Sequence, residues 1–539
     1  MGDRGGRDEG STYDAIIVGA GHNGLVAGFT LANAGLRILI LERRDIVGGA
    51  CVTEEFAPGY RASTGAYVLS MLREPVWRGM KLRRRGVTVD PAGPTLNLYP
   101  DGARYLMSDD MEATLSETRR FSSADADALV RFEHDLGELA RAVVPFFDRT
   151  AFDPRLRGLD DVRSALRYAW QLYGSRRLAQ DLAFLFTTSV RQFLGERFRS
   201  EHVMAALGWP AINDSLAGPS TPGTAYVLLH DHASDTGEGP RSWGFVRGGM
   251  GRVTELMAEA AREAGAEIRL EAAVARVHTR DGRATGVELE TGEEIPALRV
   301  LSNADPKRTF LRLCDPDDLP ASFVGAVEAY RCTGTSMKIN LGLGGLPMLA
   351  GGSGTTPQPY HTGVMELDPF LTDMDAQQAE AQRGIPADPA HIELCFPTVH
   401  DASLAPDGKH IMTIDVNSQP YRLADGDWDT MKEARADRAI AQIAEHFPTL
   451  PSMIEHRQVL SPLDLERVLG LTGGHALHGD MAPDQLLFLR PVRGYGDYRT
   501  PIRGLYLCGA GTHPGGGVTG ANGRNCAREV LRDAKRRIA

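Results

Sequence analysis

The chain has 539 residues, which is too long for one ordinary hydrophobic core, so we expect two or three lobes. Its 42% hydrophobic and 24% charged residues are typical of a soluble globular enzyme. The 59 basic and 70 acidic side chains give a net charge of −11, which leaves no basic excess to bind nucleic acid.

The chain begins with a polar, glycine-rich stretch, residues 1–12. We interpret it as a disordered lead-in, because it lacks the apolar region of a secretory signal. This interpretation favours a cytoplasmic location.

Residues 13–42 predict a β-α-β unit that binds a dinucleotide. A strand over 15–18 is followed by a G-x-G-x-x-G turn, a helix and a second strand over 37–41. Gly19 permits the tight turn, Gly21 lets the backbone approach a diphosphate, and Gly24 lets helix and strand pack closely. Polar residues interrupt the stretch too early for a membrane span.

The acidic residue Glu42 ends the second strand. Its position suits hydrogen bonds from a ribose diol and disfavours a 2′-phosphate, so NADP is disfavoured while NAD and FAD both stay open. The next segment contains Arg43 and the pair Gly48-Gly49, which resembles the second signature of flavoproteins and favours FAD. Ala50 stands where that signature usually has arginine.

Helices and strands without nucleotide signatures occupy most of residues 73–240 and 330–480. Residues 122–125 predict a helix start, an apolar face recurs at helical spacing, and Pro145 predicts the stop. More helices are expected to about residue 200. Strands are expected over 336–343, 392–399 and 410–418. A mixed sheet with a helical cap would form an apolar tunnel for a substrate.

Residues 243–277 combine a glycine turn, an amphipathic helix and a strand, and they resemble a block of phytoene desaturases. The resemblance implies that Ala273 and Val274 lie against the adenine end of FAD. Turn signals at 281–282 and 291–292 predict a small β meander, and residues 301–306 predict a strand that returns to the main sheet.

The most specific block covers residues 504–537. A strand runs into Gly509 and Ala510, and a glycine-rich turn follows through Gly517 and Val518 to a helix from about residue 520. Carotenoid desaturases have nearly the same string. This arrangement would place backbone N–H groups beside a flavin edge that becomes negative on reduction.

With these motifs, the chain resembles the phytoene desaturase-like branch of FAD-dependent oxidoreductases over nearly its full length. The resemblance implies an α/β fold of the amine oxidase and phytoene desaturase type. A Rossmann-type FAD-binding domain would comprise residues 13–72, 241–329 and 481–539, and a discontinuous substrate domain 73–240 and 330–480. The apolar helix faces favour core packing over a peripheral membrane contact.

The six cysteines form neither a C-x-x-C nor a C-x4-C pair, and no second G-x-G-x-x-G follows a strand. The sequence therefore argues against a disulfide reductase and predicts buried reduced thiols. His230 and His232 have no third ligand nearby in the sequence, so no metal site is predicted.

His513, in the flavin loop, is the first candidate for a catalytic group. Arg61 and Tyr67 follow the Gly-Gly patch and either line the flavin or lock the loop. Further candidates are His230, His232 and Trp243. As an alternative to catalysis, His513 would only orient the backbone.

Three functions stay open. The first is an FAD-dependent dehydrogenase or desaturase that moves hydride from an apolar, polyene-like substrate to the flavin. The second is an amine oxidase, against which the 7% aromatic content counts. The third is a flavin-using isomerase or a partner-binding flavoprotein.

Overall fold

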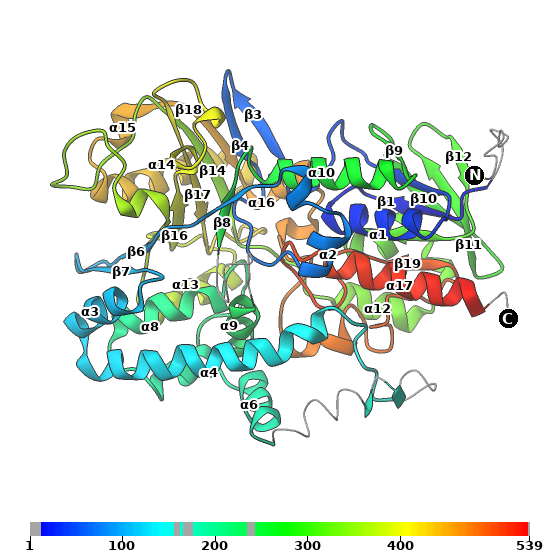
Figure 1. Cartoon of the computed structure of the whole chain (residues 1–539), viewed down its shortest axis with the longest axis horizontal. Helices are drawn as coiled ribbons and strands as arrows, with labels where there is room; N and C mark the ends of the chain where they lie inside the picture. The colour runs from blue at the N-terminus through cyan, green and yellow to red at the C-terminus, as the bar shows by residue number, and fades with distance from the viewer. Residues whose placement is uncertain (1–11, 156–161, 164, 167–175, 234–242, 537–539) are drawn as a thin grey trace.

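Two sheets organise the chain in the computed structural model (Figure 1). The structure describes residues 12–155, 162–163, 165–166, 176–233 and 243–536. The lead-in up to residue 11 and part of the predicted helical stretch before residue 176 lie outside the described residues. The residue boundaries of the two domains stay a prediction.

The first sheet is parallel and contains five strands in the order β19-β13-β1-β2-β9. Its central strands are fully buried, as expected for a parallel sheet covered on both faces. The predicted strands of the nucleotide unit and the returning strand are confirmed. The bounds are β1 Ala15–Val18, β2 Ile38–Leu41, β9 Glu267–Arg269, β13 Val300–Ser302 and β19 Leu505–Leu507.

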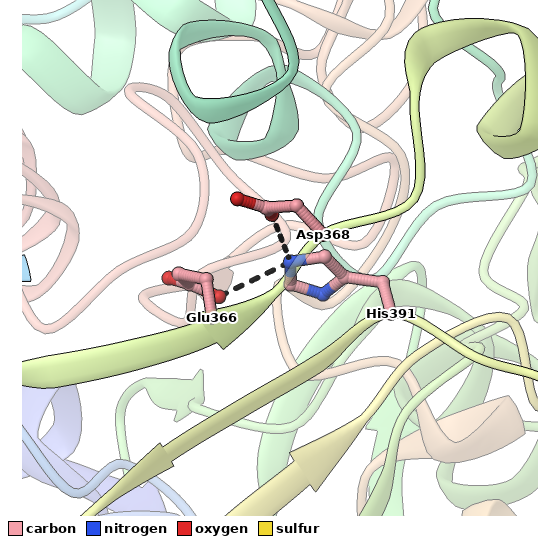
Figure 2. A group of neighbouring side chains, drawn as sticks. All are labelled: Glu366, Asp368 and His391. Atoms are coloured by element: carbon pink, nitrogen blue, oxygen red, sulfur yellow. Dashed lines mark hydrogen bonds and ion pairs between the residues drawn. The ribbon is translucent and has the colours of Figure 1, made fainter. Parts of the chain in front are cut away.

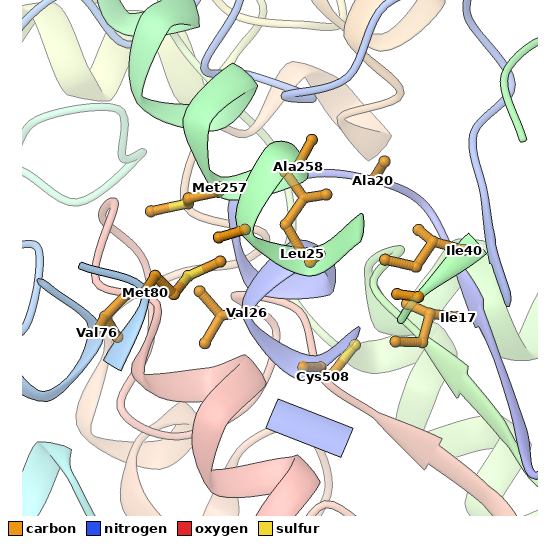
Figure 3. Close-up of a cluster of buried hydrophobic side chains, with 14 of the residues drawn as sticks. Ile17, Ala20, Leu25, Val26, Ile40, Val76, Met80, Met257, Ala258 and Cys508 are labelled. Carbon is orange, nitrogen blue, oxygen red and sulfur yellow. The ribbon is translucent and has the colours of Figure 1, made fainter. Parts of the chain in front are cut away.

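Side chains of the parallel sheet alternate between two hydrophobic clusters. Ile17 and Ile40 face a cluster that includes Leu25 and Met257 from the helices (Figure 3). The neighbouring side chains of β1 and β2 point into the other cluster, because successive strand residues face opposite sides. The helices on the first face are α1 His22–Asn33, α10 Met250–Glu263 and α17 Ala521–Arg536.

The predicted β meander covers the other cluster. It is antiparallel, and its turns fall at the expected glycines, Gly282 and Gly292. Its strands are β10 Val274–Arg280, β11 Arg283–Leu289 and β12 Glu294–Pro296, and the helix α12 Ala321–Ala329 contributes to the same cluster.

The second sheet has seven strands in the order β18-β14-β17-β16-β15-β6-β7. All neighbours are antiparallel except β6 and β15. The strand predicted over 392–399 ends early, because Pro397 begins a 3-10 turn. The bounds are β6 Thr95–Leu98, β7 Arg104–Met107, β14 Met337–Leu343, β15 Val364–Leu367, β16 Ile392–Cys395, β17 His410–Val416 and β18 Ile454–Leu460.

A layer of helices lies beside the second sheet (Figure 1). Ser122 caps α4 by accepting a hydrogen bond from the N–H of Asp125, so the predicted start is confirmed. The predicted stop was wrong, because Pro145 lies inside the last turn. The helices of this layer are α3 Met111–Phe121, α4 Ser123–Phe147, α6 Arg176–Thr187, α7 Val190–Gly195, α8 Glu201–Gly208, α9 Thr224–His232 and α13 Leu371–Gln382. The helix α14 Trp428–His446 packs instead with the strands of the second sheet in a separate cluster.

Smaller elements connect the two sheets. The hairpin β3–β4 follows the Gly-Gly patch, α2 comes next, and β5 pairs with β8 just before α10. Their bounds are β3 Thr53–Ala57, β4 Tyr60–Ser63, α2 Glu74–Gly79, β5 Val89–Pro91 and β8 Gly244–Val246. Across the described ranges, no helix is both long and apolar enough to cross a membrane. Each of the six cysteines is a buried free thiol, as predicted.

Candidate functional site

A cavity of about 480 Å³ lies between the glycine loops of the parallel sheet and the seven-stranded sheet. Its volume is in the range of ligand-binding pockets. Most of the predicted cofactor-binding residues line it, and so does one predicted catalytic residue. These are Gly19, Gly21, Glu42, Arg43, Gly48, Gly49, Tyr67, Ala273, Val274, Ala510, Gly517 and Val518.

The first glycine loop presents its backbone to the cavity. A Cβ atom at Gly21 would lie 2.7 Å from Asn303 Nδ2, so a side chain there would have to displace the Asn303 amide group. Gly24 does not line the cavity, and a Cβ atom there would collide with the carbonyl oxygen of Gly19. Gly24 therefore allows helix and strand to pack, as predicted from the sequence.

Helix α1 begins at this loop without a side-chain cap. Its N-cap residue is Gly21, which has no side chain to accept a hydrogen bond from the first turn. The N–H groups of the first turn are therefore available to an anion, with the positive end of the helix dipole behind them. An uncapped helix start and a glycine loop whose backbone lines the cavity fit the diphosphate of a dinucleotide.

The Glu42 carboxylate is buried and braces the loop. It accepts hydrogen bonds from the N–H of Ala20 at 2.8 Å and from the N–H of Arg44 at 3.0 Å. The carboxylate also lines the cavity, and each oxygen has a second lone pair. Its role toward a ribose stays a prediction, and the bracing of the turn is an additional role.

The Gly48-Gly49 patch packs directly on the first loop. The N–H of Gly48 donates to the carbonyl oxygen of Ala20 at 2.9 Å. Gly48 has φ +127°, a conformation that favours glycine, and a Cβ atom at Gly49 would lie 3.3 Å from the Cα atom of Gly21. The two loops therefore form one backbone cradle.

Arg308 also lines the cavity, although no sequence motif pointed to it. Its Nε atom is buried and has no hydrogen-bond partner among the described residues. Arg43, by contrast, donates to the carbonyl oxygens of Arg467 and Val468. Arg308 can therefore place a positive charge beside an anionic ligand. The arginine that the flavoprotein signature usually has after the Gly-Gly pair is absent here, because that position is Ala50.

The third loop, residues 509–518, closes the cavity from the other side. Ala510, Gly517 and Val518 line it. Gly509 lies behind the lining, where a Cβ atom would be 2.5 Å from the carbonyl oxygen of Asn303. The Nδ2 group of Asn522 holds the loop by donating to the carbonyl oxygen of Thr512 at 3.0 Å.

Arg490 ties this loop to the segment that precedes it. Its side chain is fully buried and donates five hydrogen bonds of 2.8–3.3 Å, all to backbone carbonyl oxygens. The acceptors are Leu477, Gly479, Asp480, Gln485 and Ala510. One guanidinium group therefore fixes two walls of the cavity.

We expect Arg490→Met to destabilise the protein by about 3 kcal/mol or more, because it leaves five buried carbonyl groups without a donor. The shift of the denaturant midpoint measures this loss. The exposed Arg467, which pairs with Asp429, is the matched control, and Arg467→Met should change stability by less than about 1 kcal/mol. Equal effects of the two substitutions would contradict the assigned role of Arg490.

Of the three predicted catalytic residues, only Tyr67 lines the cavity. His513 is buried behind it and its Nε2–H donates to the carbonyl oxygen of Phe146 at 3.0 Å, while burial lowers its pKa to about 4. This placement fits the alternative role of a backbone-orienting histidine. Arg61 is exposed on β4, opposite Glu55 in the hairpin. Neither His513 nor Arg61 is among the residues that line the cavity.

Lys338 is the main functional candidate that sequence reasoning missed. It lies on β14 and lines the cavity, with its Nζ atom 3.4 Å from the centre of the Tyr67 ring and 3.5 Å from Asp415 Oδ2. Burial lowers the pKa of Lys338, and Asp415 opposes that shift. The available signal was a lysine near the start of a strand that is buried at every position.

Three histidines line the cavity and add polar contacts. Burial lowers the pKa of His22, His230 and His478 to about 4, so all three are neutral at pH 7. Each has one buried ring nitrogen with no hydrogen-bond partner among the described residues. These nitrogens can accept or donate a hydrogen bond to a ligand. His232, by contrast, is not part of the lining.

Comparison with known families and proteins agrees with this geometry. The profile of the family described as "Flavin containing amine oxidoreductase" matches residues 24–531. A mouse protein named pyridine nucleotide-disulfide oxidoreductase domain-containing protein 2 is 38% identical, over 97% of this chain and 94% of its own. One of the subunits of limonene dehydrogenase from Castellaniella defragrans is 27% identical, over 96% of this chain and 94% of its own.

Prolycopene isomerase of Daucus carota is 26% identical, over 97% of this chain and 80% of its own length. Among solved structures, putrescine oxidase bound to putrescine has a TM-score of 0.60 at 17% identity, with 98% of this chain and 99% of that chain covered. Cyclohexylamine oxidase of Brevibacterium oxydans has a TM-score of 0.56 at 15% identity, with 97% and 100% covered. At these identities the structures establish the fold, which is the one expected from the sequence.

Proposed function

This chain belongs to the flavin containing amine oxidoreductase family and is an FAD-dependent oxidoreductase, and from that premise we propose that it dehydrogenates an apolar substrate. Two relatives that match nearly the whole chain support the substrate class, since they are named for limonene and for prolycopene. When bound, the flavin supplies the acceptor for a hydride from a substrate C–H bond.

The observation that supports this proposal best is that one cavity connects the nucleotide cradle with the seven-stranded sheet. On our proposal, the α1 start and Gly21 bind the diphosphate, and Glu42 binds a ribose. The other predicted contacts would be with the adenine, from Ala273 and Val274, and with the flavin, from Ala510, Gly517 and Val518. The wall beyond the cradle includes apolar side chains that can pack on a hydrocarbon: Met71, Val227, Leu477 and Met481.

Lys338 is the group that we propose to accept the second hydrogen of the substrate as a proton. Loss of a hydride leaves a carbocation-like carbon skeleton, and loss of a proton from the adjacent carbon completes the double bond. Burial favours the neutral amine of Lys338, which can take that proton, and Asp415 then stabilises the ammonium ion. The Tyr67 ring, 3.4 Å from Nζ, stabilises the same charged form.

A second candidate is amine oxidation, and one observation favours it. Besides Glu42 and Glu290, three aspartates line the cavity: Asp214, Asp231 and Asp415. A carboxylate in a cavity can pair with the ammonium group of an amine substrate. A purely apolar tunnel, as expected from the sequence, would not contain these groups.

Anaerobic mixing of the FAD-loaded protein with a substrate panel tests the proposal. The panel contains limonene, a cis-polyene, putrescine and cyclohexylamine, and the readouts are the flavin absorbance and the products. Bleaching by limonene or the polyene would support dehydrogenation. Bleaching by the amines alone would support amine oxidation and overturn our proposal, and a polyene isomer formed without net bleaching would indicate an isomerase.

A further inference from the structure

A second cluster of ionisable side chains lies on the seven-stranded sheet, and its members do not line the cavity (Figure 2). Glu366 is on β15, Asp368 follows that strand, and His391 immediately precedes β16. Because alternate strand residues face the same side, Glu366 and Asp368 point to one face. The register that pairs Leu367 with Ile392 places His391 opposite Asp368.

The three side chains converge on one point. His391 Nε2 lies 3.1 Å from Asp368 Oδ1 and 3.1 Å from Glu366 Oε2, and all three donor atoms lie within 4.8 Å of one another. Two ligands of one small ion, each at about 2.1 Å from it, are about 3.0–3.4 Å apart. The two distances from His391 Nε2 already lie in this range. A rotation of one carboxylate would bring the distance between the two carboxylate oxygens into the same range.

The hydrogen bonds inside the cluster leave atoms without partners. The Asp368 contact has hydrogen-bond geometry, whereas Glu366 Oε2 is buried and meets His391 Nε2 only as an ion pair without that geometry. The second oxygen of Asp368 is also buried and has no hydrogen-bond partner among the described residues. Buried carboxylate oxygens without donors are costly, whereas an ion shared by these side chains would satisfy them.

We propose that Glu366, Asp368 and His391 bind a divalent transition-metal ion, with Zn²⁺ as the representative. One imidazole nitrogen and two carboxylate oxygens are donors that zinc accepts. The ion takes the place of the proton on His391 Nε2, and this proton leaves to solvent when the ion binds. This site is separate from the proposed function and does not depend on it.

The charge of the surrounding sheet supports a cation at this place. Across the sheet, Glu366 pairs with Glu393, Glu393 with Asp415, and Asp415 with Lys338, so the four side chains lie in one row on one face. The row contains three carboxylates and one amine, and that amine pairs with Asp415 at the other end. A divalent ion with neutral His391 would balance the two carboxylates of the cluster, which burial otherwise penalises.

Trp209 connects this cluster to the cavity. Its ring stacks on the His391 ring with 3.4 Å between centroids and 18° between planes. The next residue, Pro210, lines the cavity. An ion that fixes His391 would therefore also fix this part of the cavity wall.

Zinc binding to the FAD-loaded protein tests the proposal, after chelator treatment and dialysis. Titration calorimetry and elemental analysis should give one tightly bound Zn²⁺ per chain. His391→Gln and Asp368→Asn should each weaken binding by at least about 100-fold. The matched control is His475→Gln, because His475 is also buried between two carboxylates, those of Asp214 and Asp480, at 3.2 Å each. These two carboxylates contact different nitrogens of the His475 ring, so they do not converge on one point. The control should retain the zinc.

Zinc binding that is absent from the wild type, or that is unchanged in both cluster variants, would overturn the proposal. A second measurement covers the case in which these variants do not fold. Co²⁺ at the cluster should quench the fluorescence of Trp209, so the wild type should lose more fluorescence than Trp209→Phe at the same Co²⁺ concentration. Equal losses in absolute intensity would also overturn the proposal.

Discussion

Gly21→Val should purify with little or no FAD. A Cβ atom at this position would lie 2.7 Å from Asn303 Nδ2, on the surface where we propose that the diphosphate binds. Overpacking of this kind costs about 1–3 kcal/mol, which corresponds to an affinity for FAD about 5- to 150-fold lower. The ratio of flavin to protein absorbance and a titration of the apoprotein with FAD both measure the loss.

The matched control for this substitution is Gly137→Ala in α4, where an added Cβ atom meets nothing within 4 Å. This variant should keep its flavin and gain a few tenths of a kcal/mol or more in stability, because alanine favours a helix interior. Full FAD occupancy in Gly21→Val would contradict the assignment of the first loop to the diphosphate.

Lys338→Met should retain FAD and lose about 100-fold or more in the rate of flavin reduction by substrate. The expected size follows from the contribution of a positioned acid or base. The substitution also leaves the buried Asp415 without its amine partner. Stopped-flow absorbance under anaerobic conditions measures the rate, and the flavin content of the purified variant shows whether the cradle is intact.

Lys409→Met provides the comparison for that experiment. Lys409 pairs with Glu455 away from the cavity, so its loss should leave the rate of flavin reduction nearly unchanged. If Lys338→Met reduces its flavin as fast as the wild type, then Lys338 does not accept the substrate proton and another group must do so.

The cofactor cradle could be predicted from the sequence because its determinants are local. The turn at residues 19–24 lies between two short apolar strands, and each glycine has a steric reason that can be inferred from spacing alone. The predicted strands β1, β13 and β14 and the start of α4 at Ser122 are confirmed for the same reason. Pro145 misled the prediction of the α4 end, because the helix tolerates it in its last turn.

The rest of the site depends on contacts between segments far apart in the chain. The role that we propose for Lys338 depends on its contacts with Tyr67, which lies in a loop, and with Asp415, which lies on another strand. A catalytic role for His513 was predicted because it lies in the flavin loop. In the structure its ring is buried, contacts the backbone carbonyl oxygen of Phe146 and is not part of the cavity lining. The sequence predicted no metal site because Glu366 and His391 meet only through the strand register.

Our central claim is that substrate hydride passes to FAD in a cavity with Lys338 in its wall. The most direct test is the rate of anaerobic flavin bleaching by a substrate that is deuterated at the bond to be broken. We predict bleaching without oxygen that is slower for the deuterated substrate than for the protiated one. Conversion of the substrate with no bleaching at all, and with no effect of deuterium, would contradict the claim.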